Sequence, residues 1–173
     1  MHRILIVLLA TFLLAGCAHE RASARRPEWS EVRTRTDVAR VLDDLHDAAS
    51  KAQADRYFGL FTTDAVFLGT DASERWTIEQ FKGYALPLFS KGRGWTYTPR
   101  ERHIQVGNDG VAWFDELLDN AKYGTCRGSG LLRQQPSGIW RIAQYDLSVP
   151  IPNDMLPGIA EEIRKFEEQS KQK

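Results

Sequence analysis

The second half of the chain most constrains the fold, because it holds four strand-like runs separated by short turn sequences. The runs are residues 95–106, 111–120, 125–133 and 139–149. The links between them carry the Gly, Asn, Asp and Pro residues that are typical of tight turns. Consecutive strands with such short connections must pair antiparallel. This half of the chain therefore predicts an antiparallel meander.

The first half shows helical periodicity. Apolar residues recur at three- and four-residue spacing from Thr36 to Ala52, and Asp55 can cap a second short helix. Residues 65–68 form a short strand candidate, and Thr77–Gln80 has the form of a capping box that opens a third helix. A final helix begins near Asn153. Helices followed by a meander predict an α+β fold, in which one bent sheet wraps around the N-terminal helices.

The N-terminus indicates an address in the cell envelope. Arg3 precedes an apolar run, Ile4–Leu14, that is too short for a permanent membrane span but suits a signal peptide. The run ends in Leu14-Ala15-Gly16-Cys17, which resembles the bacterial lipobox. The resemblance implies that residues 1–16 are a lipoprotein signal peptide and that Cys17 is lipidated. An ordinary cleaved signal or an N-terminal helix anchor are the alternatives.

The residue after the cysteine bears on which membrane holds the anchor. In lipoproteins, Asp at that position retains the protein at the inner membrane, and this chain has Ala18. We therefore expect the periplasmic face of the outer membrane in a Gram-negative host. Residues 17–29 are polar and predict a flexible tether, residues 30–152 one domain, and residues 153–173 a C-terminal helix with a charged tail.

Composition excludes several classes of function. The chain has 23 basic and 23 acidic residues, so no basic field exists to recruit nucleic acid. It contains no Cys/His cluster and no carboxylate spacing of a metal site, and no phosphate loop or dinucleotide fingerprint. We therefore expect neither metal nor cofactor. Cys126 is the only cysteine besides Cys17, so the hydrophobic core must hold the domain together without an internal disulfide.

A family resemblance emerges from several stretches taken in order. They are residues 64–70, 74–77, 94–99, 112–116, 124–130, 140–142 and 147–150. Together they resemble the SnoaL-like branch of the nuclear transport factor 2-like superfamily over residues 36–152. The resemblance implies a cone with a pocket at its open end. Superfamily members include cyclases, isomerases, dehydratases and non-enzymatic ligand-binding or oligomerisation modules, so the fold alone leaves the function open.

Strand alternation predicts which side chains line that pocket. A two-residue turn at Ala121-Lys122 would place Glu116 directly opposite Arg127 on the concave face. A four-residue loop over residues 134–137 would add Gln144 and Asp146 to the same face. An apolar wall with a few convergent polar groups suits a small-molecule site. The predicted ligand-binding residues are Arg127, Glu116, Trp76, Phe114, Trp140, Gln144, Tyr57 and Trp95.

The predicted polar pair has two interpretations. Arg127 could bind an anionic or carbonyl oxygen of a ligand while Glu116 orients it, or the two could form an ion pair that only braces the sheet. As a general base, the sequence offers Asp146, Glu116 or His103. The register of residues 95–106 is ambiguous by one position. One register points His103 inward, and the other points Ile104 inward and places Arg102 against Glu116.

The opposite face of the predicted sheet is apolar and has no obvious cover. Its members would be Trp113, Leu117, Cys126, Leu132, Tyr145 and Leu147. Exposed patches of this kind usually mark an interface, so we expect a homodimer formed sheet to sheet.

Three functions remain open at this point. The first is a lipid-anchored domain that binds a small, partly apolar ligand. The second is a cofactor-independent isomerase, dehydratase or hydrolase that uses a pocket carboxylate or His103. The third is a dimeric interaction module without a ligand.

Overall fold

The computed structural model describes residues 28–171. The predictions for the signal peptide and Cys17 concern residues outside this range. The elements are α1 (Glu28–Ser50), α2 (Ala54–Phe58), β1 (Phe61–Leu68), β2 (Arg75–Thr77), α3 (Ile78–Phe89), β3 (Thr98–Val106), β4 (Val111–Asn120), β5 (Gly124–Gln134), β6 (Trp140–Ser148) and α4 (Leu156–Ser170).

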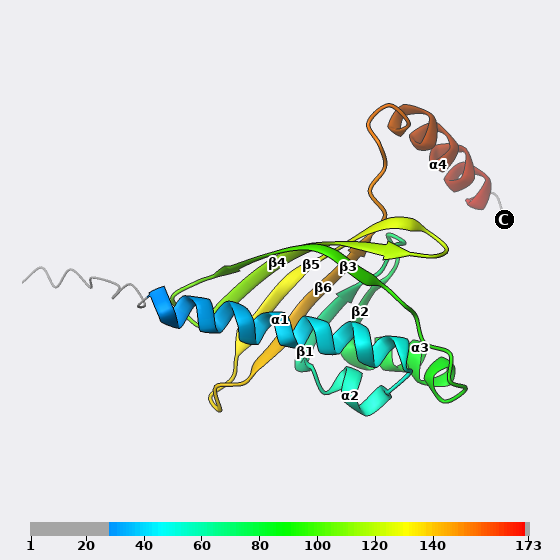
Figure 1. Ribbon diagram of the computed structural model, residues 1–173. Coiled ribbons are helices and arrows are strands. Elements are labelled where there is room, and N and C mark those ends of the chain that lie inside the picture. Colours follow the sequence, from blue (N-terminus) through cyan, green and yellow to red (C-terminus); the bar gives the residue numbers. More distant parts are fainter. Residues whose placement is uncertain (1–27, 172–173) are drawn as a thin grey trace, which may run out of the picture.

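The strands form one bent six-stranded sheet that lies over α1, with α2 and α3 at one end (Figure 1). The strand order is β2-β1-β6-β5-β4-β3. The antiparallel meander from β3 to β6 and the α+β layout are confirmed. β1 joins the meander by pairing parallel with β6, which its long connection through α3 and the other strands allows. β2, which the sequence did not predict, pairs antiparallel with β1.

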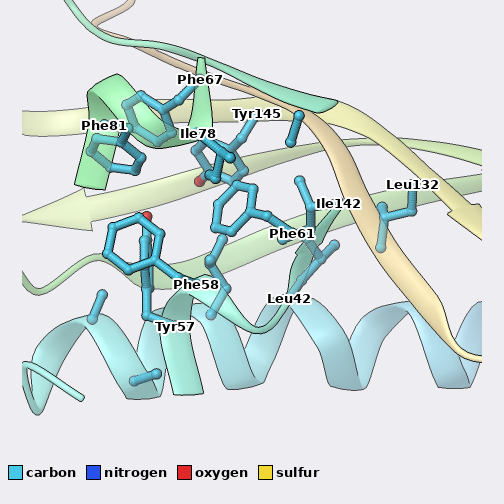
Figure 2. Close-up of a cluster of buried hydrophobic side chains, with 14 of the residues drawn as sticks. Leu42, Tyr57, Phe58, Phe61, Phe67, Ile78, Phe81, Leu132, Ile142 and Tyr145 are labelled. Carbon is cyan, nitrogen blue, oxygen red and sulfur yellow. The ribbon is translucent and has the colours of Figure 1, made fainter. Parts of the chain in front are cut away.

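The core lies between the concave face of the sheet and the helices. α1 contributes Val38, Leu42 and Leu45 at helical spacing, as predicted, and all three are buried. Figure 2 shows Tyr57 and Phe58 facing rings from α3 and the sheet. Full burial of one such apolar side chain contributes about 1.5–3 kcal/mol, so this cluster stabilises the domain without a disulfide.

The helix starts agree only in part with the sequence. The capping box of α3 is confirmed, because the Thr77 hydroxyl accepts the Gln80 N–H and the Gln80 side chain accepts the Thr77 N–H. Asp55 is not a cap; it lies in the first turn of α2, after Gln53. α1 begins at Glu28, well before the predicted start at Thr36. The sequence did not indicate these first turns because they are polar and show no apolar periodicity.

The β4–β5 turn differs from the predicted two-residue turn, and this difference changes the predicted site most. Asn120 pairs with Gly124, so the turn has three residues, 121–123, and not two. Gly124 takes the left-handed conformation, with φ of 71°, that ends such a turn, and Asn120 Oδ1 accepts the N–H groups of Lys122 and Tyr123. The shift by one residue turns every β5 side chain to the opposite face. Glu116 therefore pairs with Gly128 and not with Arg127.

A bulge makes a similar correction in β6. Leu132 pairs with Ile142 and Leu131 with Gln144, so Ala143 is an extra residue. Before the bulge, Ile142 points inward as predicted, but after it Tyr145 is the inward residue. Gln144 and its alternate neighbour Asp146 therefore lie on the outer face, contrary to the prediction.

The predicted dimer surface loses most of its members for the same reasons. Cys126, Leu132 and Tyr145 are buried inside the monomer, and Leu147 packs against the core. Trp113, 49% exposed, does lie on the outer face, with the partly buried Leu117 nearby. The continuous apolar face that motivated a sheet-to-sheet homodimer is therefore absent from the described domain, and the dimer remains a prediction.

The predicted C-terminal helix forms as α4 and stands apart from the sheet at the end of an extended segment (Figure 1). None of its side chains is buried, and Phe166 is 71% exposed. Between residues 28 and 171, no helix combines the length and apolar character needed to cross a membrane.

Candidate functional site

A cleft of about 220 Å³ opens at the end of the domain where β1, β2, α3 and the β4–β5 turn meet. Its wall is mainly aromatic. The lining residues are Phe67, Gly69, Thr70, Glu74, Trp76, Phe81, Tyr84, Trp95, Tyr97, Tyr123 and Leu147.

The start of α3 sets the position of these rings. The capping box fixes α3 directly after β2, so Trp76 of β2 stacks on Phe81 with ring centroids 5.7 Å apart and on Tyr84 at 5.1 Å. Phe81 and Tyr84 are three residues apart and so share a helix face. Phe67 and Phe81 are buried at the floor, whereas Tyr84 and Tyr123 are half exposed at the rim.

The cleft continues inward to a small chamber of about 20 Å³. Trp95 and Tyr97 line both spaces, and His46 and Tyr145 line only the inner one. A chamber of this size has room for about one water molecule. Burial raises the pKa of Tyr97 to about 12, so its hydroxyl is neutral at physiological pH.

A buried carboxylate lies behind the inner chamber. Glu116 is 1% exposed, and its Oε1 is 2.7 Å from His46 Nε2 and accepts the Tyr145 hydroxyl at 3.2 Å. Its Oε2 accepts Arg102 Nε at 2.7 Å. Arg102 also donates through Nη1 to Asp43 at 2.7 Å. A chain of polar groups thus runs from the inner chamber to the surface of α1.

The partners determine the protonation of this network. Burial alone would raise the pKa of Glu116, but the hydrogen bonds and charges of His46 and Arg102 outweigh it and hold that pKa below its ordinary value. Burial and the negative charge of Glu116 raise the pKa of Tyr145 well above its ordinary value. Glu116 is therefore an ionised acceptor, and His46 Nε2, the Tyr145 hydroxyl and Arg102 Nε are its donors.

Comparison with known proteins identifies the family. The model of the SnoaL-like domain matches residues 38–152. The chain belongs to the SnoaL-like domain family. No curated protein matched the chain.

Solved structures agree on the fold of this SnoaL-like domain. An NTF2-like protein of unknown function from Pseudomonas putida is 11% identical, with a TM-score of 0.60, and the match covers 72% of this chain and 92% of that one. A protein of unknown function from Mycobacterium tuberculosis is 17% identical, with a TM-score of 0.59, and the match covers 76% of this chain and 80% of that one. A candidate ketosteroid isomerase from Shewanella frigidimarina is 18% identical, with a TM-score of 0.52, and the match covers 65% of this chain and 94% of that one.

The SnoaL-like domain brings only some of the predicted ligand residues to the cavity. Trp76 and Trp95 line the cleft, and Tyr57 lines the inner chamber. Phe114 and Trp140 face inward as expected but are buried in the core. They line neither the cleft nor the inner chamber.

The predicted polar residues are mostly elsewhere. Arg127 is exposed on the outer face, so it does not pair with Glu116; the extra turn residue is the reason. Gln144 is exposed and Asp146 lies on the outer face, as a result of the β6 bulge. His103 is exposed and bonded to Glu101, because β3 takes the register that points Ile104 inward and places Arg102 against Glu116.

The most important residue that sequence reasoning missed is His46. It lies four positions after Leu42 and three before Ala49, both buried, so a titratable ring occupies the apolar stripe of α1. A histidine at a core position of a predicted helix was the available signal. Tyr84 and Glu74 gave no comparable signal. Tyrosines on exposed helix faces and glutamates in turns are common in sequences and do not by themselves indicate a site.

Proposed function

We propose that this SnoaL-like domain binds a small, partly apolar ligand in the aromatic cleft. The observation that carries the proposal is an open space of about 220 Å³ whose wall is mostly rings. Aromatic rings that line an open space offer a large apolar contact area to a ligand. The volume lies below the roughly 300 Å³ at which pockets for drug-sized compounds begin, so the ligand is small.

Ligand-observed NMR with a panel of small aromatic and alicyclic compounds tests this proposal, together with native mass spectrometry of the freshly purified protein. The matched variants are Trp76→Ala, at the wall of the cleft, and Trp113→Ala, on the outer face of the sheet. We expect binding that Trp76→Ala abolishes and Trp113→Ala preserves. Equal loss in both variants, or no bound compound in either experiment, contradicts the proposal.

A second candidate function is proton transfer to the bound ligand by His46. The observation that favours it is the position of the imidazole at the inner end of the cavity, with Nε2 held by Glu116. Because the ionised Glu116 keeps the proton on Nε2, a neutral His46 presents Nδ1 as the basic atom. No residue in the described part of the chain is hydrogen-bonded to Nδ1. His46 thus takes the role that the sequence offered to Glu116, Asp146 and His103.

Hydrogen–deuterium exchange at carbon tests this second function. Compounds that bind are incubated with the protein in heavy water, and loss of their C–H signals is followed by NMR. His46→Gln should stop the exchange, while His103→Gln, a change at the exposed histidine of β3, should leave it unchanged. Exchange that survives His46→Gln would contradict the assignment of the base.

We also propose that the domain is held in the cell envelope by a lipid on Cys17. The support is the lipobox-like sequence Leu14–Cys17. Membrane fractionation and fatty-acid labelling of the full chain test it, with Cys17→Ser as the matched change. Sedimentation of the unlipidated domain tests the predicted homodimer. A dimer that binds nothing in the ligand screen would favour the third function, an interaction module.

A further inference from the structure

The charges on the wall of the cleft indicate the chemical class of the ligand. Glu74 is the only charged residue among those that line the cleft, and no lysine, arginine or histidine joins it. The remaining wall is aromatic except for Gly69, Thr70 and Leu147. An anion would therefore meet a carboxylate and π-electron faces, and the lining residues carry no positive charge of their own; the ammonium of Lys122 lies over the rim ring of Tyr123.

Glu74 is placed at the cleft and lacks a cationic partner. Its side chain folds over Gly69, in the space that a Cβ at position 69 would occupy. Within residues 28–171, its one side-chain hydrogen bond comes from the backbone N–H of Asp71 at 3.3 Å, and no cation lies within salt-bridge distance. The residue is partly buried. Partial burial of an unpaired carboxylate costs free energy that a positively charged occupant would recover.

The aromatic faces favour the same kind of occupant. A cation above the face of a Trp, Tyr or Phe ring is attracted by the ring quadrupole, by about 0.5–2 kcal/mol per contact. Trp76, Tyr84 and Tyr97 contribute such rings beside Glu74. One rim ring already has a cation over it, because Nζ of Lys122 lies 4.8 Å from the ring centroid of Tyr123.

We propose that the ligand of this cleft is a small organic cation, such as an alkylated or quaternary ammonium compound. Its positive charge is held between Glu74 and the rings of Trp76 and Tyr84, and its apolar part extends toward Trp95. This inference rests on the proposed function, since it names the ligand class of the same cleft.

Matched probes that differ only in charge test the inference. Choline and its neutral isostere 3,3-dimethylbutan-1-ol are titrated into the protein and followed by calorimetry and tryptophan fluorescence. Benzyltrimethylammonium serves as a larger cation. We expect both cations to bind, and choline to bind at least about tenfold more tightly than the isostere, as one salt-bridge-like contact and two ring contacts together predict.

Two glutamine variants separate the local charge from the overall charge. Glu74→Gln keeps the shape and the hydrogen bond from Asp71 but removes the charge, so we expect it to weaken choline binding about tenfold and to leave the isostere unaffected. Glu79→Gln makes the same change at an exposed residue of α3 that pairs with Lys82, and should alter neither.

The outcomes distinguish this inference from the proposed function. Equal affinity for choline and its isostere, or no effect of Glu74→Gln, overturns the cationic ligand while ligand binding itself stands. Binding of neutral aromatic compounds, with no binding of either cation, also overturns the cationic ligand and leaves the proposed ligand binding intact. Failure of every probe, neutral and cationic, overturns the proposed function as well.

Discussion

The imidazole of His46 and the carboxylate of Glu116 join α1 to β4, with Nε2 and Oε1 2.7 Å apart. Arg102 approaches the same carboxylate from β3, also at 2.7 Å. The charge of Glu116 is thus compensated by groups from a helix and from a neighbouring strand. A buried charge of this kind is tolerated only while its partners are present, so the network makes the position of α1 on the sheet specific.

Removal of the arginine should therefore be strongly destabilising. We expect Arg102→Ala to lower the free energy of unfolding by about 3–5 kcal/mol, because it leaves the Glu116 charge buried without the guanidinium that compensates it. Urea denaturation measures the change. Arg100→Ala is the matched control on the same strand, since Arg100 forms an exposed pair with Asp119 and should cost at most about 1 kcal/mol. Similar costs for the two variants would contradict a buried network.

The lowered pKa of Glu116 predicts a pH dependence. A carboxyl whose pKa is lower in the folded state stabilises the fold above its unfolded pKa, near 4.3 for glutamate. That stabilisation is lost as the pH falls through the folded pKa. We therefore expect the stability difference between wild type and Glu116→Gln to shrink as the pH falls below about 4.3. Urea titrations at each pH measure it, and a difference that grows toward acid contradicts the assigned direction.

Most elements of this domain were predictable because each depends on a short stretch of sequence, although the three-residue β2 was not predicted. The capping box at Thr77 and the apolar stripe of α1 are local patterns, and both are confirmed. The inward side of β4, with Phe114 and Glu116, also follows from alternation within one strand.

The polar site was less predictable because it depends on how strands pair. Arg127 and Gln144 were predicted on the concave face but lie on the outer face. One additional turn residue is the reason for Arg127, and one bulged residue is the reason for Gln144. Each shift by one residue exchanges the two faces of a strand. The glycine at position 124 was a local sequence sign of the longer turn, since the turn ends there in the left-handed conformation, whereas nothing in the sequence near Ala143 indicates the bulge. The contact of His46 with Glu116 joins residues 70 positions apart and follows only from the packed fold.

The strand opposite Glu116 requires a glycine. A Cβ at Gly128 would lie closer to the Tyr145 hydroxyl and to Glu116 Oε1 than protein atoms approach. We expect Gly128→Ala to cost about 1–3 kcal/mol through overpacking and to displace the Tyr145 hydroxyl. Gly83→Ala is the control with the opposite sign. A Cβ there meets nothing within 4 Å in α3, so alanine should stabilise the domain by up to about 1 kcal/mol. Thermal unfolding of both variants measures these changes, and a Gly128→Ala variant as stable as wild type would contradict the close packing at Gly128.

The α4 helix should contribute nothing to the stability of the domain. Its side chains are all at least partly exposed, and apolar residues such as Ile163 and Phe166 have no cover in the described chain. We expect a chain that ends after Pro152 to unfold at the same urea concentration as the full domain. It should also be less prone to associate, because an exposed apolar stripe is removed. A drop in the unfolding midpoint on truncation would show that α4 packs on the domain in solution.

Cys126 should be chemically silent in the folded protein. Its side chain is fully buried on the inward face of β5, and burial raises the pKa of the thiol. Because the thiolate is the reactive form, both effects slow its reaction with a disulfide reagent. In a Cys17→Ser background, where Cys126 is the sole thiol, we expect labelling at pH 8 to be slow in buffer and to accelerate as urea unfolds the domain. The rate should then follow the population of opened molecules. Rapid, complete labelling in native buffer would instead place Cys126 on an accessible face, the position that the shorter β4–β5 turn had predicted.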